Sequence, residues 1–203
     1  MHPSSDLVVA VLAAGASRRL GRAKQLVAIG GEPLLRRQCR CALDAGVGKV
    51  IVVLGFNADE HSSLIQDLPV DVHVNDDWDE GLAATLRCAV RAAQMQSVAV
   101  LVLPCDQYRI VPEDLDALYR RWHAAPSKAC VSRAGDYTGP PVILPVEYHD
   151  HVRRLRGDMG ARSLIYGSQW SSPEEVENPR AGFDLDSPTD LRIAEDWARR
   201  RSA

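Results

Sequence analysis

Short apolar runs alternate with amphipathic segments over the first two thirds of the chain. Residues 7–12 are apolar throughout and rich in valine, and the run is too short to span a membrane, which predicts a buried parallel strand. Residues 98–103 form the second most apolar run and predict another central strand. The alternation of such strands with helices is typical of an α/β fold with a mostly parallel sheet and helices on both faces.

The remaining pattern predicts shorter strands beside these two, with helices between them. We expect the strands at residues 49–54, 70–74, 129–133 and 142–144, with a turn-rich segment at residues 135–141. We expect the helices at residues 58–66, 81–95, 146–155, 161–166 and 189–200, with two more that open at Pro33 and Pro112. No linker interrupts the pattern, so we expect residues 1–203 to form a single domain.

The composition is that of an ordinary soluble globular protein, with 46% hydrophobic and 25% charged residues. A net charge of −3 argues against nucleic acid or an anionic membrane as the main partner, whereas a small phosphorylated ligand needs only a local positive pocket. No apolar run reaches spanning length and the first residues carry no signal-peptide pattern, so we expect a cytoplasmic protein.

The residue types that most often bind transition metals are scattered along the chain. Five cysteines lack paired spacing, which predicts reduced and mostly buried thiols. His149 and His151 lie close together, but nothing nearby completes a coordination set, so we expect both at the surface.

The loop after the first strand has the composition of a phosphate site. Small residues at positions 13–16 let the backbone approach a phosphate closely, and Arg18, Arg19 and Lys24 add positive charge. An α/β fold binds ligands at the carboxyl edge of its sheet, where this loop should open. A surface loop that happens to hold glycine and arginine is the alternative. Neither a P-loop nor a G-x-G-x-x-G motif occurs in the chain.

Three aspartates are candidates for the divalent metal that normally accompanies a triphosphate. Asp106 directly follows the strand at residues 98–103, although a turn or a helix cap would also explain it. Asp184 and Asp186 would project to the same side of an extended segment. Asp186 is also a candidate helix cap, as is Ser187, and capping leaves Asp184 unexplained.

A polar segment at residues 75–86 offers a site for the base or ribose. Asn75, the backbone of Gly81 and Thr85 would supply the contacts. The alternative is that the three aspartates in this segment only favour the positive end of the following helix.

These motifs together resemble those of a known family. Residues 12–26, LAAGASRRLGRAKQL, closely resemble the LAAGxSxRMGxxKLL signature of MobA-like nucleotidyltransferases, and within them the molybdenum cofactor cytidylyltransferases. Further matches follow in family order: Gly31 to Leu35, Asn75 with Gly81, Leu82 and Thr85, Asp106-Gln107, Gly157 to Arg162, and Asp184 to Pro188. The resemblance covers nearly the whole chain.

The resemblance implies a Rossmann-like fold of the nucleotide-diphospho-sugar transferase type. It implies transfer of a nucleoside monophosphate from its triphosphate to a phosphate acceptor, with pyrophosphate released. The Ala13-Ala14 pair resembles the cytidylyltransferase branch, which implies CTP with Mg²⁺, a phosphorylated pterin-type molybdenum cofactor as acceptor, and a recipient molybdoenzyme. The alternatives are a GTP-using enzyme, another phosphorylated acceptor, and a non-catalytic cofactor chaperone.

The resemblance also implies residue roles. The implied nucleotide site comprises Leu12, Ala13, Ala14, Gly15, Ser17, Lys24, Asn75, Gly81 and Thr85. The implied catalytic residues are Arg18, Lys24 and Asp106; the metal ligands are Asp106 with Asp186 or Asp184; the acceptor loop holds Gly157, Asp158, Gly160 and Arg162. Gly139-Pro140-Pro141 replaces a common Gly-His-Pro of the family. The sequence therefore identifies the acceptor less well than it identifies the reaction.

Overall fold

A seven-stranded sheet forms the centre of the computed structural model, which describes residues 6–94, 98–167 and 171–202. The strands are β1 Leu7–Ala13, β2 Ala28–Ile29, β3 Glu32–Pro33, β4 Lys49–Leu54, β5 Asp71–Val74, β6 Ala99–Pro104, β7 Cys130–Ala134, β8 Tyr137–Leu144 and β9 Glu174–Glu177. The α-helices are α1 Leu34–Ala45, α2 Ala58–Ser63, α3 Leu82–Gln94, α4 Pro112–His123, α5 His149–Val152, α6 Arg162–Ile165 and α7 Pro188–Ser202. Short 3₁₀ helices occur at Lys24–Leu26, Trp78–Glu80 and Val146–Tyr148.

The order of the strands is β5-β4-β1-β6-β8-β7-β9, with β1 between its parallel neighbours β4 and β6. Val9 pairs with Val50 on one side and with Leu101 on the other, which buries the most apolar runs at the centre. Strand β8 runs antiparallel to both β6 and β7, whereas β7 and β9 are parallel. The predicted mostly parallel sheet is therefore confirmed.

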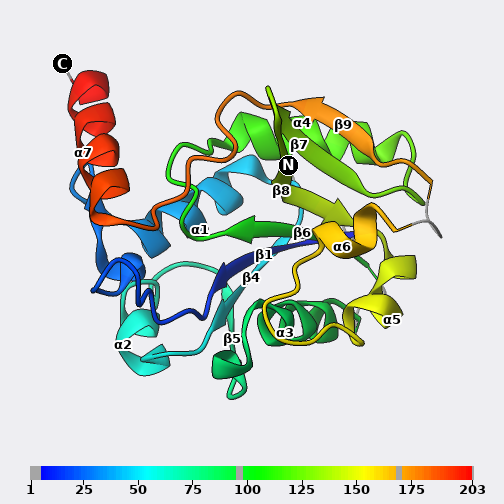
Figure 1. The fold of residues 1–203 in the computed structure, drawn as a ribbon, viewed down its shortest axis with the longest axis horizontal. Coiled ribbons are helices and arrows are strands. Elements are labelled where there is room, and N and C mark those ends of the chain that lie inside the picture. Colours follow the sequence, from blue (N-terminus) through cyan, green and yellow to red (C-terminus); the bar gives the residue numbers. More distant parts are fainter. Residues whose placement is uncertain (1–5, 95–97, 168–170, 203) are drawn as a thin grey trace.

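Helices cover both faces of this sheet (Figure 1). One apolar cluster joins the sheet to α1 and α4 through buried residues such as Leu35 and Leu118. A second cluster on the opposite face joins it to α3, α5 and α6 through residues such as Leu86, Val152 and Ile165. Within the described ranges, no helix is both long and apolar enough to cross a membrane.

Several predicted boundaries are corrected by the structure. Most of the predicted turn at residues 135–141 belongs to β8, because Tyr137 to Gly139 continue the pairing with β7 beyond the register shift at Val131 and Ser132. Strand β9 was not predicted, and the helix expected at residues 146–155 is a 3₁₀ turn followed by the short α5. The end expected for the third helix, Met95, lies outside the described residues.

The expected cysteine chemistry is confirmed, whereas one histidine differs. All five cysteines are free, and four of them are buried. His149 is 1% exposed rather than at the surface, because it lies on α5, which packs against α3, and this burial lowers its pKa.

One edge of the sheet collects the chain segments that carry the candidate chemistry. Strands β1, β4 and β6 all end there, because they are parallel. Strand β8 begins there, because it is antiparallel to β6. Its first residues, Tyr137 to Pro140, therefore lie beside the chain that leaves β6 at Pro104.

Candidate active site

A cavity of about 450 Å³ opens at this carboxyl edge of the sheet. That volume is within the usual range for small-molecule sites. Most of the nucleotide and metal residues expected from the sequence line it: Leu12, Ala13, Ala14, Gly15, Lys24, Gly81, Thr85, Asp106, Asp184 and Asp186. The predicted acceptor residue Asp158 lines it as well. Five separate chain segments thus meet in one cavity.

The loop after β1 is held in place by Gln25, a residue that the sequence analysis did not single out. The Gln25 Nε2 donates to the carbonyl oxygens of Ala13 and Gly15, each at 2.8 Å. Gln25 is 1% exposed, so this amide fixes the loop from beneath. Ser17 closes the loop further on, where its Oγ accepts from the Lys24 N–H at 3.1 Å.

Lys24 lies between two carboxylates inside the cavity. Its Nζ is 2.7 Å from Asp106 Oδ2 and 3.0 Å from Asp186 Oδ1. Burial alone would lower the pKa of Lys24, but attraction to Asp106 and Asp186 outweighs it, so the pKa lies above its usual value. Arg19 approaches the same centre from the solvent side, with its guanidinium 3.2 Å from Asp186 Oδ2.

Asp184 joins this group through the backbone. A bridge pairs Gln107 with Asp184, and the Leu185 N–H donates to the Asp106 carbonyl oxygen at 3.1 Å. This pairing brings the segment after β6 against a segment nearly 80 residues further along the chain. Burial, and then repulsion from Asp106, raise the pKa of Asp184 to about 6.

The donor set fits a magnesium ion. Asp184 Oδ1 is buried and has no hydrogen-bond partner among the residues that the structure describes. Asp184 also lies close enough to Asp106 for repulsion to raise the pKa of the Asp184 carboxyl. A buried carboxylate oxygen without a partner, next to a second carboxylate, is suited to a hard cation. Over residues 6–94, 98–167 and 171–202, no group of three or more His, Cys, Asp or Glu side chains could hold a metal by itself. Mg²⁺ needs only one or two carboxylates, since phosphates and water complete its octahedron.

Ser187 and Asp190, the remaining polar residues of this segment, form a cap at the start of helix α7. Asp190 Oδ2 accepts from the Ser187 N–H and Oγ, each at 2.7 Å, and from the Asp186 N–H at 3.2 Å. The capping role considered for Ser187 is thus present, at the start of α7. The Asp186 side chain is left to face Lys24 and the cavity.

Gly81 connects the nucleotide side of the cavity to the expected acceptor loop. Its φ of +115° suits glycine, and a Cβ there would lie 2.6 Å from Asp158 Oδ1 and 2.7 Å from the Gly157 carbonyl oxygen. The Ala83 N–H then donates to the same Gly157 oxygen at 2.9 Å. Two loops that are distant in sequence are therefore in direct contact.

Trp78 forms an aromatic wall that the sequence analysis did not identify. It lines the cavity beside Ala14 and Thr85 and makes an edge-to-face contact with Phe56 at 5.3 Å between ring centroids. Gly55 makes this placement feasible, since a Cβ at that position would overlap Trp78 and approach Ala14 to 2.9 Å. A half-buried indole in the wall of a cavity can stack on the ring of a bound base.

Tyr137 and Gln107 connect the carboxylates to β8. Gln107 Nε2 donates to Tyr137 Oη at 3.0 Å, and Tyr137 Oη donates to the Pro140 carbonyl oxygen at 2.8 Å. Burial raises the pKa of Tyr137 to about 12, so its hydroxyl remains a donor at neutral pH. The start of β8 is thereby fixed against the metal side of the cavity.

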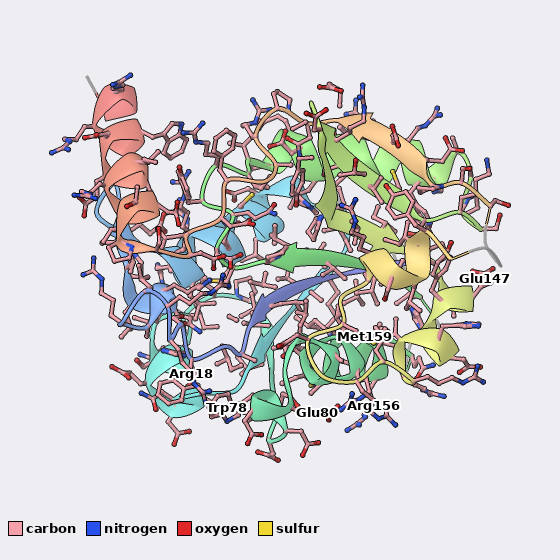
Figure 2. All side chains as sticks on the ribbon, viewed as in Figure 1. Arg18, Trp78, Glu80, Glu147, Arg156 and Met159 are labelled. Atoms are coloured by element: carbon pink, nitrogen blue, oxygen red, sulfur yellow. The ribbon has the colours of Figure 1, made fainter. Side chains whose placement is uncertain are left out.

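The structure separates some of the expected site residues from the main cavity. Arg18 is exposed on the loop and does not line the cavity (Figure 2). Asn75 donates to Thr85 Oγ1 at 3.4 Å but faces a small pocket of about 90 Å³ on the other side. Gly160 and Arg162 line a second cavity that adjoins the first.

Comparison with protein families assigns the chain. The model of the MobA-like NTP transferase domain matches residues 9–174, which is most of the chain. The chain belongs to the MobA-like NTP transferase family. It is accordingly a nucleotidyltransferase of that family, and the resemblance found in the sequence is confirmed.

Relatives of this MobA-like chain carry several different names. The purine catabolism protein PucB of Bacillus subtilis is 30% identical over 91% of this chain and 94% of its own. A probable molybdenum cofactor guanylyltransferase of Opitutus terrae is 32% identical over 79% of this chain and 77% of its own.

A solved structure confirms the fold of the MobA-like chain. The structure of Rv0371c from Mycobacterium tuberculosis matches with a TM-score of 0.84 and 27% identity, over 97% of this chain and 100% of that one. A complex of that protein with manganese matches with a TM-score of 0.79 and 24% identity, over 94% and 98% of the two chains. The MobA-like chain therefore has the nucleotide-diphospho-sugar transferase fold.

Proposed function

We propose that residues 1–203 act as one Mg²⁺-dependent cytidylyltransferase, which transfers CMP from CTP to a phosphorylated pterin-type molybdenum cofactor and releases pyrophosphate. The observation that carries the proposal is the meeting of the loop after β1, Lys24 and three aspartates in one cavity. A protein that only binds the finished cofactor would not need these residues, because their role is to hold a triphosphate with its metal.

The chain's residues divide the work of the transfer. The backbone at residues 13–15 cradles the phosphates, and Lys24 with Arg19, the arginine that lines the cavity in place of Arg18, neutralises their charge. Asp106, with Asp184 or Asp186, holds the metal, whose contribution when bound is to neutralise the charge that develops on the phosphate oxygens. No covalent nucleophile from the protein is required, because positioning and charge neutralisation dominate in-line phosphoryl chemistry.

The base end of the nucleotide lies against Trp78, Gly81 and Thr85 in this proposal. Cytidine is chosen because Ala13 and Ala14 stand where related guanylyltransferases usually carry glycines. The relative from Opitutus terrae, named as a guanylyltransferase, favours GTP as the alternative. The acceptor phosphate attacks from the side of Asp158 and the loop at residues 157–162.

The test is a nucleotide panel with a direct product readout. The protein is incubated with Mg²⁺, molybdopterin-type cofactor and CTP, GTP, ATP or UTP in turn, while pyrophosphate and the dinucleotide product are measured. We expect pyrophosphate and a cytosine dinucleotide with CTP. Turnover with GTP and none with CTP would overturn the base assignment, and release with none of the nucleotides would overturn the transfer itself.

A further inference from the structure

The second cavity, of about 200 Å³, adjoins the active site. Leu12, Leu82, Pro104 and Pro140 line both cavities, so the two cavities meet at these four side chains. The second cavity is therefore within reach of a molecule that reacts in the main one.

The walls of this second cavity are almost entirely apolar. Val102, Val131, Val142 and Ile165 line it, and each is 1–3% exposed. Arg162 is the one charged side chain among its lining residues, and its guanidinium donates to the Thr138 carbonyl oxygen at 2.7 Å at the surface end. A ring with hydrogen-bonding groups on its buried edge would lose its water there without replacement.

The rim of the cavity is apolar as well. Leu82 is 43% exposed and Tyr166 is 48% exposed, and both side chains line the cavity. Met159, next to Gly160 of the lining, is 50% exposed and lies on the segment between α5 and α6 (Figure 2). Exposed apolar side chains gathered around an apolar cavity are typical of a ligand site.

The size of the cavity limits what enters it. An empty apolar cavity of about 150 Å³ is large enough to bind benzene. The cavity here is somewhat larger, which leaves room for one ring and a short substituent. The ring must come from the acceptor, because the nucleotide is expected against Trp78 and the loop after β1.

We infer that the acceptor is a phosphomonoester with an uncharged ring, whose face and inner edge are poor in hydrogen-bonding groups and occupy the apolar cavity, with its phosphate at the mouth beside Arg162. This inference rests on the proposed nucleotidyl transfer. It replaces the pterin-type acceptor by the alternative of another phosphorylated acceptor, because the edges of a pterin ring carry many hydrogen-bonding groups that these apolar walls would leave without partners.

A pair of phosphomonoesters tests the inference without requiring turnover. Benzyl phosphate and glycerol 3-phosphate carry the same reactive group but differ in the part that would be buried. We expect benzyl phosphate to bind at least about 10-fold more tightly in ligand-observed NMR titrations. Equal affinities for the two would overturn the inference.

Two valines on one strand provide a matched comparison. Val102 and Val100 are both buried in β6 and point to the same face, but only Val102 lines the cavity. Val102→Thr should weaken benzyl phosphate binding about 5-fold or more and leave glycerol 3-phosphate binding unchanged. Val100→Thr should change neither affinity. Equal effects of the two substitutions would overturn the inference.

A third variant fills the cavity and guards against misfolding. Ala161 lines the cavity and is 8% exposed, so Ala161→Leu should remove the preference for benzyl phosphate, with thermal unfolding as the check on folding.

Failure of the proposed nucleotidyl transfer would give a different result from failure of this inference. No nucleotide would then release pyrophosphate with any acceptor, while the preference for benzyl phosphate would persist.

Discussion

The two cavities of this protein share a partition but rely on opposite physics. The main cavity gathers charge, with Lys24 between Asp106 and Asp186 and a partly buried Asp184 beside them. The second cavity gathers apolar surface from β6, β7, β8, α3 and α6, with one cation near its surface end. Charged groups fix the reacting phosphates in a defined geometry, whereas apolar walls select a ligand by shape.

In the proposed function, the charged cavity therefore carries out the transfer, and the apolar cavity determines which acceptor binds. Substitutions in the charged cavity should reduce turnover whatever the acceptor. Substitutions in the apolar cavity should change which acceptor is used.

The largest expected effect is that of Asp106→Asn. Removing this carboxylate should lower kcat for pyrophosphate release by roughly 100-fold or more, because Asp106 is the proposed ligand of the metal that neutralises charge on the phosphate oxygens. Binding of benzyl phosphate should remain unchanged. Asp116→Asn on α4 is a control, since Asp116 pairs with Arg120 far from the site. A matching loss of benzyl phosphate binding would contradict the division.

Lys24→Met should lower turnover and raise the affinity for Mg²⁺. Turnover should fall by about 100-fold, because the triphosphate loses its buried cation. Mg²⁺ without nucleotide should bind more tightly to the variant, since Asp106 and Asp186 lose the ammonium between them. Isothermal titration with Mg²⁺ measures this, and Lys128→Met, which breaks a pair with Glu174 instead, is the matched control. Unchanged or weaker Mg²⁺ binding would argue against a metal at these carboxylates.

Asp184 should make stability depend on pH. Its folded pKa of about 6 lies above the ordinary value of 3.8, so the protonated carboxyl stabilises the fold below pH 4. That contribution, about 2 kcal/mol once solvent screening of the partly exposed carboxyl is included, is lost as the pH rises through 6. Urea unfolding from pH 4 to pH 7 should show the wild type losing stability relative to Asp184→Asn. The exposed Asp136→Asn should show no such divergence, and parallel curves for wild type and Asp184→Asn would exclude the raised pKa.

Trp78→Leu should have the smallest effect of the series. Loss of the indole wall should raise KM for the nucleotide about 10-fold and change kcat little, since stacking contributes binding rather than chemistry. Trp78→Phe should recover most of the affinity. Trp197→Leu on α7 serves as a control, because Trp197 is not among the residues that line either cavity. A fall in kcat with KM unchanged would place Trp78 outside the base site.

The centre of the fold could be predicted because its strands are buried on both faces. Strands β1, β4 and β6 consist of nearly continuous apolar residues, which only a parallel sheet between helices accommodates. Strand β9, with the sequence EEVE, lies at the edge and is half exposed, so no apolar run marks it. The start of β8 was misassigned because Gly139, Pro140 and Pro141 are typical of turns.

The charged part of the site could be predicted for a related reason. Asp106 follows a central strand directly, and the placement of a strand end within a sheet can be read from the sequence. Gln25 and Trp78 could not be identified this way, since a buried amide or an indole belongs to no catalytic motif. The apolar cavity was also missed, because its valines are indistinguishable in sequence from those of an ordinary core.

Strand β8 runs antiparallel to β6 and β7, so its first residues, which line the two cavities, lie next to a hairpin. Its residues Tyr137 to Pro140 follow a tight hairpin from β7, with Gly135 in the left-handed region at φ +58°. A change in the length of that hairpin would change the lining of these cavities without shifting β1, β4 or β6. In the proposed function, the residues that bind the nucleotide and the metal therefore follow the parallel strands, whereas residues that select the acceptor lie beside a hairpin whose length can change independently.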